Sequence, residues 1–326
     1  MSELHKFIFE GLPVRGALVR LTDSWQEILQ RRAGNAQTGA YPQPLRVTLG
    51  EMAAAAVLMQ SNIKFDGALI LQVMGDGPVK LAVVEVQPDL AFRATATVEG
   101  VVADDASLGA MLNAQGQARC AITLDPKTRF PGQQPYQGVV PLQDDAGQTL
   151  PDFAAVLQQY MLRSEQLQTT LVLAADDQVA AGLLIQRLPV QGAGNLEGQA
   201  GASDAEAMDE HYNRIATLAS SLKREELLTL DAETVLRRLF WEETLARFEP
   251  LAGDSGPRFA CSCSRERVGK MILGLGREDA EQLLQERLKI DVACEFCGKH
   301  YHFDAVDAAQ IFTEASRLAS GGTQAH

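Results

Sequence analysis

Hydrophobic and polar residues alternate along several short stretches in the first 190 residues of the chain. Val14–Leu21 and 92–98 have the period of two that is typical of a half-buried strand. The stretches 68–74 and 79–86 are more uniformly apolar, and the turn sequence Gly75-Asp76-Gly77-Pro78 separates them. We therefore predict strands at the first two stretches and a β-hairpin at the second two. Further strands are expected at 120–124, 137–142, 169–173 and 183–188.

Two longer apolar stretches interrupt these strands with the spacing of helices. The first runs over about 44–60 and contains 52–59, whose small side chains permit close packing. The second runs over about 151–163, and we expect its N-terminal cap near Thr149 or Leu150. This mixture predicts an α+β fold, in which an N-terminal mixed α/β domain contains β-sheets and packed helices.

Glycine, alanine and small polar residues replace this pattern at 191–207 and predict a flexible linker. Helical spacing then returns over about 210–244, with Asp231 as the expected cap of a helix. The apolar residues of this region are Ile215, Leu218, Ala219, Leu222, Val235, Leu236, Leu239, Phe240 and Trp241. Two interpretations are open: two amphipathic helices packed on a core, or a marginally stable segment whose apolar face is covered only conditionally.

The length of the chain, 326 residues, is enough for about two domains with a sizeable core. We divide it into an N-terminal domain at 1–190, a flexible and then helical linker at 191–250, and a small cysteine-bearing domain at 251–326. Within the last part, a compact module is expected at 258–312. Hydrophobic residues make up 46% and charged residues 22%, which excludes wholesale disorder.

The balance of charge narrows the range of partners. Acidic residues outnumber basic ones by 42 to 29, so the formal net charge is −13 and nucleic acid is repelled on average. No apolar run approaches the roughly 20 residues that span a bilayer. The first seven residues lack the basic and then apolar pattern of a secretory signal. We therefore expect a cytoplasmic protein that binds neither nucleic acid nor membranes.

Five cysteines carry most of the candidate chemistry. Cys120 lies alone in a predicted strand and is expected to pack as a small hydrophobic residue. The other four form two close pairs, which in a long acidic chain indicate a metal or redox site. Zinc favours four thiolates in a tetrahedron, so one Zn²⁺ per chain is predicted. Its ligands are Cys261, Cys263, Cys294 and Cys297, while His300 and His302 are expected at the surface or behind the ligands.

Each of the two cysteine pairs could also undergo redox chemistry on its own. Residues i and i+2 of an extended segment lie roughly 6.6 Å apart on one face, near the upper limit for a disulfide. Cys-x-x-Cys is a familiar redox spacing. Each half-site could therefore close a local disulfide once the metal is lost. Nearby basic residues could offset the thiolate charge and lower the thiol pKa values: Arg258, Arg265, Arg267, Lys270 and Lys299.

These cysteine segments resemble the redox-switch domain of a known bacterial family. The sequences FACSCSRER at 259–267 and CEFCGKHYHF at 294–303 are similar to the redox-switch domain of the redox-regulated chaperones of 33 kilodaltons, a heat shock protein family. The resemblance covers nearly the whole chain and departs from the family at 31–40 and 191–207. Its other motifs are 9–16, Tyr41-Pro42-Gln43-Pro44, Lys64-Phe65-Asp66-Gly67, Gly75-Asp76-Gly77-Pro78, Tyr136-Gln137-Gly138-Val139-Val140, Arg163-Ser164-Glu165-Gln166-Leu167 and, in the linker, Glu225-Glu226-Leu227-Leu228.

The resemblance implies an ATP-independent holdase rather than an enzyme. The family is folded, zinc-bound and inactive when reduced, and after oxidation it binds unfolded or partly folded client proteins and dimerises. Residue by residue, its zinc ligands match the four paired cysteines, and its disulfides would be Cys261–Cys263 and Cys294–Cys297. The segment 1–190 would then be the client-binding and dimerisation domain, and 251–326 the redox switch.

Two other classes of protein fit the sequence less well. A zinc-dependent thiol-disulfide oxidoreductase would use Cys294 and Cys297, but no thioredoxin-like βαβ pattern surrounds them and the Cys-x-Cys pair is left without a role. A zinc-ribbon binder of nucleic acid is opposed by the net charge of −13.

Overall fold

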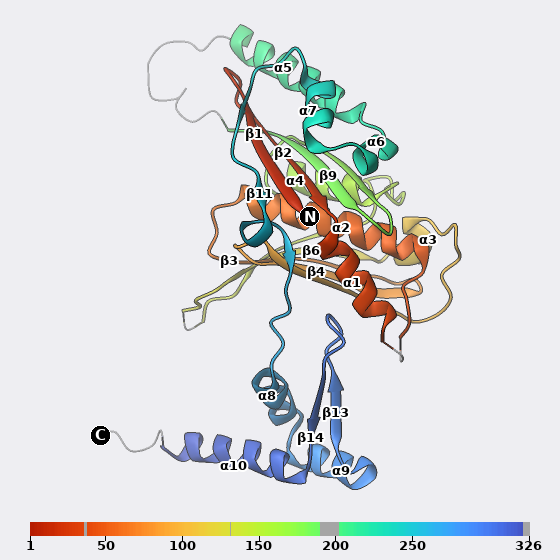
Figure 1. Ribbon diagram of the computed structural model, residues 1–326, viewed down its shortest axis with the longest axis vertical. Coiled ribbons are helices and arrows are strands. Elements are labelled where there is room, and N and C mark those ends of the chain that lie inside the picture. The colour runs from red at the N-terminus through yellow and green to blue at the C-terminus, as the bar shows by residue number, and fades with distance from the viewer. Residues whose placement is uncertain (36–37, 131, 190–201, 322–326) are drawn as a thin grey trace. The chain divides into compact units, whose positions relative to one another are not determined.

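The computed structural model describes residues 1–35, 38–130, 132–189 and 202–321 (Figure 1). Contacts divide the chain into two compact units, Met1–Ala260 and Cys261–His326. The segment 202–250 and the following ten residues therefore belong to the first unit by their contacts, although the functional division into 1–190, 191–250 and 251–326 stays a prediction. Over the described ranges, no helix combines the length and the apolar character needed to cross a membrane.

The first unit contains two sheets, and its strands and helices have defined limits. The strands are β1 (Glu3–Phe9), β2 (Val14–Leu21), β3 (Gly67–Met74), β4 (Val79–Val86), β5 (Ala91–Val98), β6 (Arg119–Pro126), β7 (Tyr136–Pro141), β8 (Thr169–Ala175), β9 (Ala180–Arg187), β10 (Leu245–Arg247), β11 (Leu251–Ala252) and β12 (Arg258–Phe259). The helices are α1 (Asp23–Ala33), α2 (Gln43–Asn62), α3 (Leu108–Leu112), α4 (Phe153–Arg163), α5 (Ala202–Ser220), α6 (Arg224–Thr229), α7 (Ala232–Phe240) and the short 3₁₀ turn η1 (Gly253–Ser255).

Helix α2 lies between the two sheets and contacts strands of both (Figure 1). The first sheet has the order β10-β1-β2-β9-β8, with β11 also paired to β1, and the second has the order β12-β5-β4-β3-β6-β7. All eight residues at 52–59 are buried, because a helix enclosed on every side is apolar all round. At Gly50 of α2 an added Cβ would lie 2.5 Å from the Cβ of Ala175 on β8, so the close contact between this helix and the sheet requires glycine.

Most predicted elements are present, and the α+β fold is confirmed. The hairpin β3–β4 pairs Met74 with Leu81 across the predicted turn. The cap of α4 was placed wrongly, because Asp152 is its N-cap and its carboxylate accepts a 2.8 Å hydrogen bond from the Ala155 amide. Helices α1 and α3 and strands β1 and β10–β12 were not predicted.

Helices α5, α6 and α7 cover the face of the first sheet that points away from α2 (Figure 1). Alternation along β2 explains this two-sided burial, because Val19 belongs to the core around α2 and Leu18 to the core under these helices. The ring of Phe240 on α7 lies 6.1 Å from that of Phe7 and 5.1 Å from that of Phe9, measured between ring centres. We call this second core the linker core. The linker region is thus packed on a core in this structure.

Three details of the linker differ from expectation. The region contains three helices rather than two, although Asp231 caps α7 as predicted and accepts from the Thr234 amide at 2.8 Å. Helix α5 already begins at Ala202, inside the stretch expected to be flexible, and 191–201 lies outside the described residues. Trp241 was grouped with the buried apolar residues but is 74% exposed, because it follows the last turn of α7.

An ion pair between a half-exposed arginine and a largely buried glutamate joins α6 to α2. The guanidinium of Arg224 lies 3.6 Å from the carboxylate of Glu51 and also donates to the carbonyl of Ala175. Burial raises the pKa of Glu51 to about 7, although Arg224 opposes this shift; the charge of Asp152 adds to it. Ionised Glu51 therefore costs the folded state free energy.

This cost predicts an unusual dependence of stability on pH. A carboxyl whose folded pKa is raised stabilises the fold below its ordinary value of 4.5, and that contribution is lost as the pH rises through about 7. As the pH rises from 5 to 8, the unfolding free energy of Glu51→Gln should increase relative to that of wild type by at most roughly 3 kcal/mol. The measurement is urea unfolding followed by the fluorescence of Trp25, which is fully buried in the first unit. An equal difference at both pH values would contradict the role of Glu51, and Glu27→Gln, at a side chain that is 44% exposed, is the control.

Candidate metal centre

The second unit is a small framework around a β-hairpin. Its elements are α8 (Arg265–Leu275), α9 (Arg277–Arg287), β13 (Ile290–Ala293), β14 (His300–Phe303) and α10 (Ala305–Gly321). Six buried residues form its core: Ile272, Ala280, Ile290, Tyr301, Phe303 and Phe312. The apolar spacing read between Cys263 and Cys294 corresponds to α8 and α9. So small a core leaves room for a metal to contribute much of the stability.

The two cysteine pairs lie in two different segments of this framework. Cys261 and Cys263 precede α8, where Ser264 is the N-cap and accepts from the Arg267 amide at 3.2 Å. Cys294 and Cys297 lie in the turn between β13 and β14. In that turn the Cys294 amide donates to the Lys299 carbonyl at 2.9 Å, and the Gly298 amide donates to the Cys294 carbonyl at 2.8 Å. Gly298 has a φ of 70°, a conformation that favours glycine.

All four paired cysteines come together. Their sulfur atoms lie within 4.8 Å of one another, with Cys261 and Cys294 at 3.6 Å and Cys263 and Cys297 at 3.4 Å. Four thiolates bound to one zinc at about 2.3 Å in a tetrahedron would be about 3.8 Å apart. The cluster is therefore the right size for a metal ion, and all five cysteines, each in a described range, are present as thiols. Cys120 is fully buried in β6, where burial raises its pKa to about 12.

Tyr301 is a member of the site that the sequence analysis missed. Its hydroxyl donates to the sulfur of Cys263 at 3.1 Å, and the ammonium of Lys299 lies 5.2 Å from the centre of its ring. Burial opposes ionisation of Cys263, but hydrogen bonds from Tyr301 and the other thiols outweigh it and lower the pKa to about 7. The signal for Tyr301 was its place in β14, where alternation points it inward beside the cysteine turn.

The thiols of Cys294 and Cys297 resist ionisation when no cation is near. Burial, together with the neighbouring thiol of Cys261, raises the pKa of Cys294. Burial and the other thiols likewise raise the pKa of Cys297 far above its ordinary value. The four groups therefore cannot all carry charge unless a positive ion joins them.

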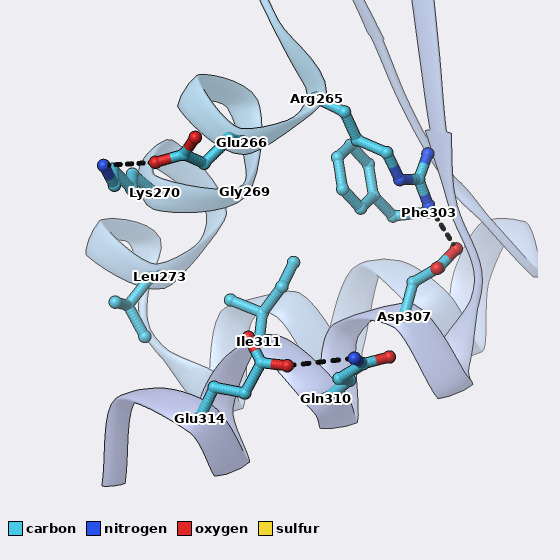
Figure 2. A pocket seen from close by; sticks show the side chains of 10 residues that line it. All are labelled: Arg265, Glu266, Gly269, Lys270, Leu273, Phe303, Asp307, Gln310, Ile311 and Glu314. Atoms are coloured by element: carbon cyan, nitrogen blue, oxygen red, sulfur yellow. Dashed lines mark hydrogen bonds and ion pairs between the residues drawn. The ribbon is translucent and has the colours of Figure 1, made fainter. Parts of the chain in front are cut away.

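Most of the basic residues expected to offset this charge have other partners. Arg265 pairs with Asp307 at 2.7 Å, donates to the His302 carbonyl at 2.6 Å and lies over the ring of Phe303 (Figure 2). Lys270 pairs with Glu266 at 2.7 Å. Arg258 pairs with Asp89 in the first unit. Arg267 stays close to the ligands, because it donates to the Ser262 hydroxyl at 2.7 Å.

A groove of about 570 Å³ between α8 and α10 is separate from the sulfur cluster (Figure 2). Gly269 and Leu273 of α8 face Ile311 of α10 across it, and the Arg265–Asp307 pair closes one end. Its lining includes none of the five cysteines, all of which are described. The imidazoles of His300 and His302 are also outside the sulfur cluster and are 42% and 53% exposed.

Comparison with known proteins agrees with this architecture. The family model described as "Hsp33 protein" matches residues 2–304. The chain is 45% identical to the 33 kDa chaperonin of Chromobacterium violaceum over 95% of this chain and 94% of the relative. It is 43% identical to the 33 kDa chaperonin of Methylobacillus flagellatus over 96% and 94%. The solved 33 kDa chaperonin of Thermotoga maritima has the same fold, with a TM-score of 0.71 and 18% identity over 97% of this chain and 98% of that one.

The fold, the cysteine cluster and these relatives define a chaperone and not an enzyme. The chain belongs to the Hsp33 family, as its sequence motifs predicted. As a chaperone it binds client proteins. The oxidoreductase alternative is not supported, and its Cys294–Cys297 pair lies in a hairpin turn rather than at the N-terminus of a helix.

Removal of the metal should unfold the second unit selectively. Structural zinc contributes about 10–16 kcal/mol in small metal-dependent domains near neutral pH, far more than this core can replace. Chelation, or Cys263→Ser, should make 261–312 sensitive to limited proteolysis while the first unit stays resistant. The matched control is Cys120→Ala, which removes a thiol that is outside the cluster. Equal resistance of 261–312 with and without metal would show that the thiols do not hold the unit together.

Proposed function

We propose that this chaperone is an ATP-independent holdase whose activity is gated by the redox state of one zinc–thiolate centre. The reduced form binds one Zn²⁺ through Cys261, Cys263, Cys294 and Cys297 and is inactive. Oxidation releases the ion and activates binding of unfolded or partly folded proteins, which prevents their aggregation. The observation that carries the proposal is the gathering of four thiol sulfurs within 4.8 Å in a unit with few other core residues.

Oxidation would close the disulfides Cys261–Cys263 and Cys294–Cys297. Each pair of thiolates gives two electrons to one molecule of hydrogen peroxide, which takes up two protons from solvent and leaves as two molecules of water, while the zinc ion is released. Local pairing is favoured because a shorter loop costs less entropy to close, and only one or two residues separate the partners. The short contacts of the reduced form join Cys261 to Cys294 and Cys263 to Cys297, so cross-pairing is the alternative to exclude.

The chain itself connects the centre to the linker core. Cys261 follows β12 closely, and β12 is anchored by the parallel pairing of Phe259 with Phe92 and by a 3.0 Å bond from the Ala260 amide to the Phe92 carbonyl. The short strands β10 and β11 lie between α7 and β12 in sequence and pair with β1. Unfolding of the second unit would remove the anchor at one end of this connection, and a Cys261–Cys263 disulfide would bend the chain beside it.

Release of α5–α7 would expose apolar surface on both partners. Phe240 would leave Phe7 and Phe9, and burial of one such side chain contributes about 1.5–3 kcal/mol. Loss of a few contacts of this size would exceed the stability that these three helices have on their own. Both the bare sheet and the helices could then hold the apolar segments of a client.

Two further features of the proposal come from the family resemblance. The active form is a homodimer, which the newly exposed apolar surface would favour. The protein acts in the cytoplasm, where thiols stay reduced until oxidative stress occurs. Neither nucleic acid nor a membrane takes part, consistent with the net charge of −13.

The gate predicts that oxidation and mild heat act together. The test is suppression of the aggregation of a heat-denatured client by the reduced, the oxidised, and the oxidised and warmed protein, all without ATP. We expect little suppression by the reduced form and the strongest by the oxidised and warmed form. Peptide mapping after differential alkylation should find the two local disulfides. Equal suppression by the reduced, zinc-loaded protein would rule out the gate, and cross-paired disulfides would rule out the assigned pairing.

Weakening the linker core should make the protein partly active without oxidation of its cysteines. Leu236 and Leu239 are 1% and 4% exposed, and truncation of a buried leucine costs about 2–5 kcal/mol. The double variant Leu236→Ser, Leu239→Ser should therefore suppress aggregation while its centre is still reduced. The control Trp241→Ser changes a neighbouring residue that is 74% exposed and should stay inactive. An inactive reduced double variant that is still folded would show that α7 is not the latch.

A further inference from the structure

A cavity of about 120 Å³ lies in the first unit, beside the C-terminal end of α2. Side chains from both sheets and from α2 and α4 line it, and most of them are apolar. Examples are Leu184 of the first sheet, Leu69 and Leu124 of the second, and Met59 of α2. Tyr136 of β7 is an exposed member of the lining, so the cavity is open to solvent on that side.

Three of the motifs that carry the family resemblance meet at this cavity. Arg15 belongs to the motif 9–16, Tyr136 to the motif at 136–140, and Glu165 and Leu167 to the motif at 163–167. These segments are far apart in sequence and contain none of the five cysteines. The redox chemistry of the second unit therefore gives them no role, and the cavity is where they can act together.

Two cations of the first sheet point toward the end of α2. Arg15 of β2 donates to the carbonyl of Asn62 at 2.9 Å, and Lys6 of β1 donates to that of Ser61 at 2.5 Å. Burial lowers the pKa of both groups, and the charge of Arg15 lowers that of Lys6 further. A helix C-terminus carries only about half a negative charge. More than one positive charge is therefore left uncompensated beside the cavity.

Neutral groups are the other partners of the Arg15 guanidinium. Gln186, directly opposite on β9, accepts from its Nε at 3.1 Å and also from its Nη2. The carboxylate of Glu165 also lines the cavity, but it accepts from the hydroxyls of Tyr136 at 3.1 Å and Tyr160 at 2.5 Å. Within the described ranges neither of the two cations forms an ion pair. A half-buried arginine in this state attracts an anion.

We propose that the cavity binds a small apolar carboxylic acid, with its carboxylate on Arg15 and its hydrocarbon part among the apolar side chains. The guanidinium N–H groups match a carboxylate in both charge and geometry. A dry apolar cavity of about 150 Å³ holds one benzene ring, so the cavity of about 120 Å³ suits one ring or a short branched chain. The inference does not rest on the proposed redox gate.

The experiment is calorimetric titration of the reduced, full-length protein with benzoate and with its neutral analogue benzamide. Benzoate should bind at least about tenfold more tightly, because it adds an ion pair to the hydrogen bonds that benzamide can also accept. Arg15→Gln should remove this preference. The control is Arg163→Gln, which changes an arginine that pairs with Asp145 outside the cavity lining and should keep the preference.

A second variant leaves the cation in place and fills the cavity instead. Leu167 follows α4 and lines the cavity, so Leu167→Phe should weaken the binding of both ligands at least about tenfold. Circular dichroism identifies the variants that are folded. If Arg15→Gln does not fold, the preference of the wild type for benzoate and the result for Leu167→Phe decide the question.

Four results would overturn the proposal. The first is a wild-type protein that does not bind benzoate or binds it no more tightly than benzamide. The second is a folded Arg15→Gln that keeps the preference, and the third is benzoate binding that is unchanged in a folded Leu167→Phe. The fourth concerns a peptide that ends in phenylalanine and so presents the same carboxylate and ring. If it binds more tightly than benzoate and than its own C-terminal amide, the site takes chain ends of client proteins instead of a small acid.

Discussion

Crowding of four sulfur atoms is the constraint on which the behaviour of this protein depends. The cluster holds them within 4.8 Å, where burial and mutual proximity raise the pKa of Cys294 and Cys297 while Tyr301 helps to lower that of Cys263. Thiolates this close repel one another unless a divalent cation neutralises them, or unless they are oxidised in pairs. In the proposed function these are the two states of the centre: reduced with a bound cation, or oxidised to disulfides.

The first unit supplies the element that this switch would move. One face of its first sheet packs on α2, and the other face is covered by α5–α7 through the linker core. From α7 the chain reaches Cys261 through β10, β11 and β12, which have only three, two and two residues. So few ladder hydrogen bonds hold this segment only weakly. In the proposed gate, the connection between the cysteine centre and α7 is thus made of short strands.

Periodicity and spacing in the sequence predicted the parts of the molecule that have a strong local signal. The long helix α2, the hairpin β3–β4 and the four ligand candidates belong to this group. Strands of two residues such as β11 and β12 have no period to detect, and their pairing is decided by distant partners. The exposure of Trp241 and the contact of Tyr301 with Cys263 likewise depend on where a helix ends and how a hairpin folds over a turn. These are tertiary facts that composition does not contain.

In the proposed gate, loss of the thiolate cluster in the second unit releases α7 in the first. Amide hydrogen exchange over residues 235–240 is the test, in the reduced, zinc-loaded protein and again after peroxide has oxidised the cysteines. We expect the linker core to protect these amides in the reduced form, and we expect them to exchange freely once α8 and α9 have lost their own protection. Continued protection of 235–240 in a protein whose second unit has unfolded would contradict the gate.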